Sequence, residues 1–408
     1  MNKAKYDGME HPVRQVTDLK DIIVSSCSMF KDDTAFLEKD KPGGTFQPVS
    51  YAKVKDDMDA LGTKLIDMGL KGCKIAVVGE TSYHWFLTYF AAVCGVGVIV
   101  PLDKNLPQDE LKSLVERSHA KAIVFSNRME KTVKPLFDKP GEIEYFISMS
   151  ESENEKVLSL VKLIEEGNKL LREGARNFVD AEINPQDMAS LLFTSGTTGK
   201  SKGVMLSHKN IASNVVNVSK RVTLEKGCVV LSILPVHHTY ENTIDWVTIY
   251  QGRTIAICEG IKYILRNMNE VKANCMVGVP LVFEKIFKGL MKQAEGRGEG
   301  EKIRNAIALS RRLKLYNNRS LIRKLFKPIH QAFGGGMHLF IAGGAAMDPE
   351  ITEAFEAMGI PMIQGYGMTE YAPIIAVNQD NYSIAKSVGR PMPETKVRID
   401  NADENGVG

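Results

Sequence analysis

The amino-acid sequence predicts an α/β protein with two doubly wound subdomains, whose sheets are mostly parallel, followed by the start of a β-barrel subdomain. Two series of short apolar runs, bounded by glycine and separated by helical segments, indicate this fold class. Strands of a parallel sheet are buried on both faces, so they are apolar throughout instead of alternating with polar residues. The 408 residues also exceed what one compact core usually holds, so more than one packed unit is expected.

The predicted strands fall into two groups along the chain. The first group is residues 74–79, 97–101, 120–125 and 144–148, and the second is residues 228–234, 254–258, 275–279 and 339–342. This grouping predicts a first subdomain over about residues 1–210, a second over about 211–365, and the beginning of a β-barrel over 366–408. Residues 396–400 alternate apolar and polar side chains, which predicts an antiparallel strand in that last part.

Two further segments are predicted to be helical. Apolar side chains recur at helical spacing within residues 155–174, which predicts an amphipathic surface helix. Residues 284–331 are predicted as a helical insertion in the second subdomain, and they carry many more Lys and Arg than acidic residues. One interpretation of these basic helices is a solvated helical hairpin. The other is contact with an anionic membrane surface or with the phosphates of a cofactor.

The overall composition argues against several classes of protein. A net charge of +3 is small for this length, so it gives no case for nucleic-acid binding. The six cysteines include no CxxC pair, which favours reduced thiols over disulfides or a cysteine zinc site. Residues 1–15 lack the apolar segment of a signal peptide, and no run is long enough to span a bilayer. We therefore expect a cytoplasmic protein, with the basic helices as a route to peripheral membrane contact.

Residues 191–208 (LLFTSGTTGKSKGVMLSH) contain the densest chemical signal in the sequence. An apolar strand leads into hydroxyls, glycines and two lysines, and a second apolar stretch follows. Small residues let backbone N–H groups approach an oxyanion closely, while hydroxyl and ammonium groups supply further donors and positive charge. The pattern predicts a loop that holds a polyphosphate, and an ordinary turn rich in Gly, Ser and Thr is the alternative.

Two better-known loop types do not fit this segment. A Walker P-loop requires a glycine five positions before its Gly-Lys pair, and Thr194 stands there relative to Gly199. The segment does not contain GxGxxG, which marks a dinucleotide-binding turn. The phosphate-binding prediction therefore refers to a different kind of loop.

A second polar segment, residues 364–370 (QGYGMTE), carries groups suited to a nucleotide. Tyr366 stands between two glycines, so its ring is free to stack on a purine, and packing in the core is the alternative. Thr369 can donate to an α-phosphate, and Glu370 is a hard oxygen ligand suited to Mg²⁺ unless it is an ordinary surface carboxylate. The adjacent pair His237-His238 has no third ligand at metal-binding spacing, so zinc is not expected there.

Five motifs resemble, in sequence and in order, those of the adenylate-forming superfamily of acyl-CoA synthetases, luciferases and peptide-synthetase adenylation domains. They are residues 191–208, 234–241 (LPVHHTYE), 341–346 (IAGGAA), 364–370 and 388–391 (VGRP). The resemblance covers essentially the whole chain. The HHTYE sequence and the basic insertion are most similar to long-chain fatty acyl-CoA synthetases, and the chain resembles their N-terminal domain alone.

The resemblance implies ATP, Mg²⁺ and coenzyme A as ligands and assigns residues to them. The catalytic residues would be Lys202, His238, Thr369 and Glu370, and among them His238 would shape the acyl pocket. Glu370 and Thr197 would hold the metal ion. The nucleotide would be held by Thr194, Ser195, Gly196, Thr197, Thr198, Gly199, Lys202, Gly343, Gly344, Ala345, Gln364, Gly365, Tyr366, Gly367, Met368 and Thr369.

In the implied reaction a medium- or long-chain fatty acid attacks the α-phosphorus of ATP, and coenzyme A then displaces AMP from the acyl-AMP. The family's ribose-binding aspartate and its C-terminal domain with a catalytic lysine have no counterpart before residue 408, so this chain is expected to adenylate slowly or not at all. Two alternatives stay open. One is a nucleotide-binding module without turnover, and the other is a peptide-synthetase adenylation domain, in which Asp245 would pair with an α-amino group.

Overall fold

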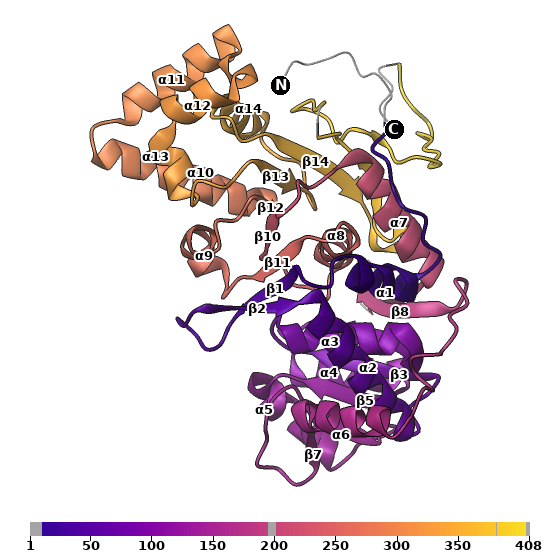
Figure 1. Ribbon diagram of the computed structural model, residues 1–408. Helices are drawn as coiled ribbons and strands as arrows, with labels where there is room; N and C mark the ends of the chain where they lie inside the picture. Colours follow the sequence, from indigo (N-terminus) through magenta and orange to yellow (C-terminus); the bar gives the residue numbers. More distant parts are fainter. Residues whose placement is uncertain (1–9, 195–200, 381, 405–408) are drawn as a thin grey trace.

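The computed structural model describes residues 10–194, 201–380 and 382–404. The chain forms two sheets, with helices packed between them and on their outer faces (Figure 1). Most neighbouring strands in both sheets are parallel, which confirms the α/β fold class predicted from the apolar runs.

The seven-stranded sheet contains the first group of predicted strands. Its strands are parallel except β9, which pairs antiparallel with β8. In sheet order they are β7 (Val157–Ser159), β6 (Tyr145–Ser148), β5 (Ala120–Phe125), β3 (Cys73–Val78), β4 (Gly97–Leu102), β8 (Met188–Thr194) and β9 (Lys202–Ser207). The helix expected within residues 155–174 begins only at Leu160, because the residues before it pair with β6 at the sheet edge.

The nine-stranded sheet contains the second group of predicted strands and three antiparallel strand pairs at its ends. In sheet order its strands are β16 (Arg390–Pro391), β15 (Ile374–Val377), β14 (Met362–Gly367), β13 (Leu339–Ala342), β12 (Cys275–Gly278), β10 (Val229–Ser232), β11 (Thr254–Ile257), β1 (Thr34–Lys39) and β2 (Phe46–Ser50). Residues 34–50 lie inside the first subdomain expected over 1–210, yet they extend this sheet because β1 pairs in parallel with β11. That long-range pairing left no local mark in the sequence.

One continuous hydrophobic cluster fills the space between the two sheets and joins them. It is formed largely by helices α1 (Leu19–Met29), α2 (Tyr51–Asp67), α3 (Tyr83–Ala91), α6 (Leu160–Arg172), α7 (His208–Arg221) and α8 (Thr239–Tyr250). The rings of Phe90 on α3 and Trp246 on α8 meet edge to face with centroids 5.1 Å apart. Large aromatic side chains from both halves of the chain therefore share one core, so the two sheets cannot separate without exposing it.

Two further clusters cover the outer faces of the sheets. The helices over the seven-stranded sheet are α4 (Gln108–Ser118) and α5 (Glu130–Val133). Those over the nine-stranded sheet are α9 (Ile264–Glu270), α10 (Pro280–Gly296), α11 (Gly300–Leu313), α12 (Arg319–Leu325), α13 (Lys327–Ala332) and α14 (Pro349–Ala357). The insertion over residues 284–331 is thus helical as predicted, and it lies on the far side of the nine-stranded sheet from the seven-stranded sheet (Figure 1).

The strand predicted over residues 396–400 is wrong. No strand is formed there, and the side chains of Val397 and Ile399 are 56% and 58% exposed. Alternating side chains make a strand only when another strand accepts its backbone hydrogen bonds, and no described strand lies beside this segment. Antiparallel β15 and β16 continue from β14, and the assignment of residues 366–408 to a β-barrel subdomain stays a prediction.

Candidate functional site

Three of the sequence motifs meet at one edge of the nine-stranded sheet. Strands β10, β12, β13 and β14 are parallel neighbours, so their carboxyl ends lie side by side. The segments that follow or end these strands are residues 233–238, 343–346 and 365–370. In open α/β sheets, ligands bind outside the carboxyl ends of the strands. This edge is therefore where a small-molecule site is expected.

The turn after β13 is held from the neighbouring strand by Gln364. Gln364 lies opposite Ala342 in the β13–β14 pair and is buried. Its Oε1 accepts the N–H of Met347 at 3.3 Å, and its Nε2 donates to the carbonyl of Ala385 at 2.7 Å. Both ends of the amide are thus engaged within the protein. Gln364 therefore shapes the 343–347 turn, and its assignment to the nucleotide stays a prediction.

Tyr240 connects the first turn of α8 to the same turn. Its hydroxyl donates to the carbonyl of Ile341 at 3.2 Å, at the end of β13. A Cβ atom placed on Gly343 would lie 2.7 Å from Cζ of Tyr240, closer than real side chains allow. Glycine is therefore required at 343 because the tyrosine ring packs directly against the backbone there.

Tyr366 extends from the end of β14 and is 53% exposed. This exposure rules out the alternative that its ring packs in the core, and it leaves one face open for stacking. The next glycine is fixed by crowding, since a Cβ on Gly367 would lie 2.1 Å from the carbonyl oxygen of Pro373. Met368 is exposed as well, and the short 3₁₀ helix η6 (Thr369–Tyr371) brings Thr369 and the exposed Glu370 to the same edge.

The predicted phosphate loop joins the antiparallel strands β8 and β9. Thr194, the last residue of β8, lies opposite Lys202, the first residue of β9. The members of the loop that were assigned to phosphates between these two residues lie outside the described residues; they are Ser195, Gly196, Thr197, Thr198 and Gly199. Strand β9 contacts η6. The fold therefore brings the strand that carries Lys202, far away in sequence, beside the segment that carries Thr369 and Glu370.

The two histidines lie between the two sheets, in the loop from β10 to α8. His238 is the residue before α8 and is exposed, and the rings of His237 and His238 lie 4.1 Å apart. His237 Nε2 lies 3.7 Å from Oδ2 of Asp103, which follows β4 of the other sheet. Burial, and then the nearby His238, lowers the pKa of His237 to about 4, and burial also lowers the pKa of His238. Both rings are therefore neutral at pH 7.

Two cavities adjoin this edge. The larger is narrow, with a volume of about 20 Å³, and lies between α7, α8 and the strands that carry the site. Its lining is apolar and includes Val218, Ile244, Val247, Ile341 and Gly365. The smaller has a volume of about 10 Å³, and His237 and Thr239 from the histidine loop line it together with Leu192 and Leu206 from β8 and β9.

Several residues of this region had no role assigned from the sequence. Asp103 reaches His237 across the sheets, and its place directly after a predicted strand was the signal that could have identified it. Tyr240 belongs to a recognised motif, but its contact with Gly343 depends on how α8 lies over β13. Asn214 on α7 holds β15 through both ends of its amide, at 2.9 Å and 3.3 Å from the backbone of Ile374.

Asp245, the residue on which the peptide-synthetase alternative depends, is fully enclosed in α8. It is 2% exposed, and neither carboxylate oxygen has a hydrogen-bond partner among the described residues. Burial, and then the charge of Glu241, raises the pKa of Asp245. It lines neither of the two cavities. Burial therefore favours the neutral form of this carboxyl group, and the role of Asp245 in a peptide-synthetase pocket stays a prediction.

The chain belongs to the family described as "AMP-binding enzyme", whose sequence profile matches residues 24–408. Its curated relatives include the peroxisomal long chain acyl-CoA synthetase 6 of Arabidopsis thaliana, which is 26% identical over 97% of this chain and 56% of that protein. The long-chain-fatty-acid–CoA ligase 1 of Cavia porcellus is 23% identical over 89% of this chain and 55% of that protein.

Solved structures show the same fold. The inhibitor-bound N-terminal domain of FACL13 from Mycobacterium tuberculosis has a TM-score of 0.71 at 18% identity, covering 93% of this chain and 83% of that one. The long-chain-fatty-acid-CoA ligase FadD1 from Archaeoglobus fulgidus has a TM-score of 0.69 at 18% identity, covering 94% and 70%. The fold and family inferred from the five motifs are confirmed. The chain spans 56% to 64% of the length of the plant long chain acyl-CoA synthetases 6, 4 and 5.

Proposed function

We propose that the protein to which this chain belongs activates a medium- or long-chain fatty acid with ATP, forming acyl-AMP and then acyl-CoA. The observation that supports the fatty acid most directly is the apolar lining of the narrow cavity behind the site edge. Gly365 and Ile341, which line the cavity, stand next to Tyr366 and the Gly343 turn. An acyl chain that widened this cavity by displacing its apolar side chains would leave its carboxyl group near the nucleotide, because the cavity and the nucleotide side share these strands.

In this proposal Tyr366 and the turn Gly343–Ala345 hold the adenine of ATP, and Thr369 donates to the α-phosphate. The β8–β9 loop from Thr194 to Lys202 would hold the outer phosphates, with Lys202 supplying positive charge. Repulsion between phosphates and an incoming carboxylate opposes the reaction, so the task of these groups is positioning and charge neutralisation. His238, neutral and at the start of α8, would border the path of the carboxylate.

Glu370 fits the metal ion that the proposal includes. It is an exposed carboxylate on the same short segment as Thr369, and Mg²⁺ commonly binds one or two carboxylates together with substrate phosphates and water. Thr197, the other proposed ligand, lies outside the described residues. The ion would neutralise phosphate charge when ATP is bound.

Binding measurements on the 408-residue chain test the proposal without requiring turnover. The probes are AMP and acyl-sulfamoyl-adenosines, which mimic acyl-AMP, with acyl chains of increasing length. We expect AMP to bind and affinity to rise with chain length, by up to about 0.8 kcal/mol per buried methylene. Equal affinity for the acetyl and dodecanoyl analogues would contradict the fatty acid, and failure to bind AMP would contradict the nucleotide site.

The same experiment separates the alternatives. A nucleotide-binding module without turnover would bind AMP but would gain no affinity from the acyl chain. A peptide-synthetase adenylation domain would prefer an aminoacyl-sulfamoyl-adenosine.

We further propose that the helical insertion contacts an anionic membrane surface. Residues 284–331 contain 13 Lys and Arg but 4 Glu, a net charge of +9, whereas the whole chain carries +3. Exposed leucines stand one helical turn apart on both α11 and α12; they are Leu309, Leu313, Leu321 and Leu325. Apolar side chains among basic groups are typical of helices that lie in a membrane interface.

Vesicle co-sedimentation tests this contact. We expect binding to phosphatidylglycerol vesicles and little to phosphatidylcholine vesicles. The double substitution Arg312→Ser and Lys324→Ser, at two exposed positions, should weaken binding about tenfold or more, since each basic group contributes about 1 kcal/mol. Lys162→Ser with Lys169→Ser on the exposed face of α6 is the matched control. Equal loss in both double variants would show that net charge alone, and not this surface, drives binding.

No helix in the described part of the chain is long and apolar enough to cross a membrane. All six cysteines are free, and Cys27, Cys94, Cys228 and Cys275 are buried. Free thiols support the proposed cytoplasmic location, because reduced cysteines are usual in that compartment.

A further inference from the structure

Glu241 lies buried in the first turn of α8 and reaches back to the start of the histidine loop. It is 1% exposed, and its Oε1 accepts the N–H of Ile233 at 3.0 Å. Ile233 is the first residue after β10, and the loop that begins there ends with His237 and His238 directly before α8. One side chain therefore closes the loop by joining its two ends.

The rest of the loop is short and depends on this closure. A second bond closes its far end, where the N–H of His238 donates to the carbonyl of Pro235 at 3.0 Å. The next residue but one, Tyr240, fixes α8 to the end of β13. Tyr240 thus joins the start of α8 to β13, which leads into the Gly343 turn. Glu241 joins the start of α8 to β10, which leads into the histidine loop.

Ion pairing does not explain why a carboxyl group is buried here. Within the described residues no Lys or Arg side chain forms an ion pair with Glu241 or with Asp245, one turn further along α8. Burial raises the pKa of Glu241 to about 7, against hydrogen bonds from the Ser232 side chain and from the backbone of Ile233 and Leu234 that favour the ionised form. Burying a carboxyl group without a cation costs stability. A glutamate in this position is therefore unfavourable for folding, which suggests a role in the site.

We propose that Glu241 is a positioning residue, which holds the backbone at Ile233 and so fixes His238 at the mouth of the acid-binding site. The inference deepens the proposed function and rests on it. Glu241 lines neither cavity, so it acts through the loop and not by touching the substrate.

Three variants of the 408-residue chain test this role. Glu241→Leu removes the acceptor and keeps an apolar side chain of similar size, Glu241→Gln keeps a carbonyl acceptor for the Ile233 N–H, and Asp245→Asn changes the neighbouring buried carboxyl group. Each variant is titrated with AMP and with dodecanoyl-sulfamoyl-adenosine. The ring resonances of His238 are followed by NMR, and the melting temperature Tm is recorded.

We expect Glu241→Leu to bind the dodecanoyl analogue about tenfold more weakly, a loss equal to one buried hydrogen bond. Its affinity for AMP should stay unchanged, and the His238 resonances should shift. Glu241→Gln and Asp245→Asn should match the unmodified chain in their affinity for the dodecanoyl analogue, their affinity for AMP and their His238 resonances. A purely structural role would lower Tm and weaken both ligands together.

The inference is overturned if Glu241→Leu folds and binds the dodecanoyl analogue as the unmodified chain does, or if Glu241→Gln fails to rescue binding. Failure of the unmodified chain to bind AMP would instead contradict the proposed function. The NMR comparison of His238 still tests the positioning role in that case, because it needs no ligand.

Discussion

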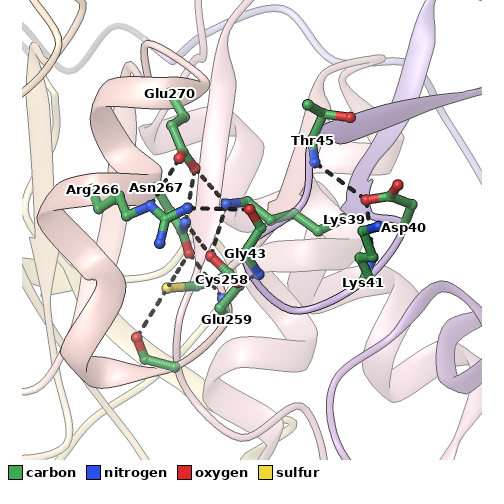
Figure 2. Close-up of polar contacts among 11 residues, drawn as sticks. Lys39, Asp40, Lys41, Gly43, Thr45, Cys258, Glu259, Arg266, Asn267 and Glu270 are labelled. Atoms are coloured by element: carbon green, nitrogen blue, oxygen red, sulfur yellow. Dashed lines mark hydrogen bonds and ion pairs between the residues drawn. The ribbon is translucent and has the colours of Figure 1, made fainter.

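The ammonium group of Lys39, the last residue of β1, lies 2.8 Å from Oε2 of Glu259, which comes just after the paired parallel strand β11 and is far away in sequence (Figure 2). The Lys39 side chain is 4% exposed and also lies 2.7 Å from Glu270 at the end of α9. The N–H of Gly43, in the β1–β2 loop, donates to the other oxygen of Glu259 at 2.7 Å. This network fastens the N-terminal hairpin to the nine-stranded sheet.

Replacing Lys39 with methionine should destabilise the protein by about 1.5 kcal/mol, because the partly buried Glu259 and the exposed Glu270 lose charged hydrogen bonds from its ammonium group. Equilibrium urea unfolding measures the change in the free energy of unfolding. Lys288→Met is the control, since that lysine is exposed and pairs with Glu284 on the surface of α10, where an ion pair contributes little. Equal effects of the two substitutions would contradict the role given to the buried network.

The same network predicts how stability depends on acid. Hydrogen bonds from Asn267, Lys39 and Gly43 lower the pKa of Glu259 from 4.5 to about 2. A group whose pKa is depressed by folding stabilises the native state above its unfolded pKa, and this contribution is lost as the pH falls. Unfolding free energy should therefore decline between about pH 4.5 and pH 2, and less steeply in Glu259→Gln. An identical pH profile for the two proteins would count against this network.

Substituting Tyr366 with alanine should weaken AMP binding about tenfold or more and leave stability unchanged. An exposed ring adds little to the core, while stacking of a base on an aromatic side chain contributes about 1–3 kcal/mol. Calorimetric titration with AMP measures the effect. Tyr263 is also exposed but follows β11, which three strands of the sheet separate from β14, and it supplies the control variant Tyr263→Ala. If Tyr366→Ala binds AMP normally, adenine does not stack there.

Gly343→Ala should lower both stability and AMP affinity, because the added methyl group would meet the ring of Tyr240. Overpacking of this kind costs about 1–3 kcal/mol. Gly289→Ala on α10 is the matched control: a Cβ there meets nothing within 4 Å, and alanine favours the helix by about 1 kcal/mol. The double variant Gly343→Ala with Tyr240→Leu should recover part of the lost stability, and no recovery would argue against the clash.

Glu241→Gln should stabilise the protein at pH 8 but not at pH 4. Folding raises the pKa of Glu241 from 4.5 to about 7. The protonated side chain therefore favours the native state fully below pH 4.5, and this contribution to stability is lost as the pH rises through 7. At pH 8 the substitution removes a buried carboxylate, with a gain of up to about 3 kcal/mol. Thermal unfolding at both pH values gives the comparison, and a gain of equal size at pH 4 would refute the assignment.

Much of the fold and of the site edge could be predicted from local pattern. Apolar runs between glycines predicted most of the parallel strands, since burial on both faces imposes that composition on each strand separately. The motif around Tyr366 and the turn at Gly343 were recognisable because a nucleotide site needs small residues and particular polar groups close together in the chain. These features depend on neighbours within a few residues, which a linear sequence contains in full.

Pairings between distant segments had no such local signal. β1 pairs with β11, more than 200 residues away, whereas the alternating residues 396–400 form no strand because no described strand lies beside them. Gln364 turned out to be engaged within the protein, Asp103 to meet His237, and Glu241 to hold Ile233. Each of these roles requires a partner that only chain packing supplies, because a hydrogen bond or a ladder contact depends on where two groups lie in space and not on the chemistry of either one alone.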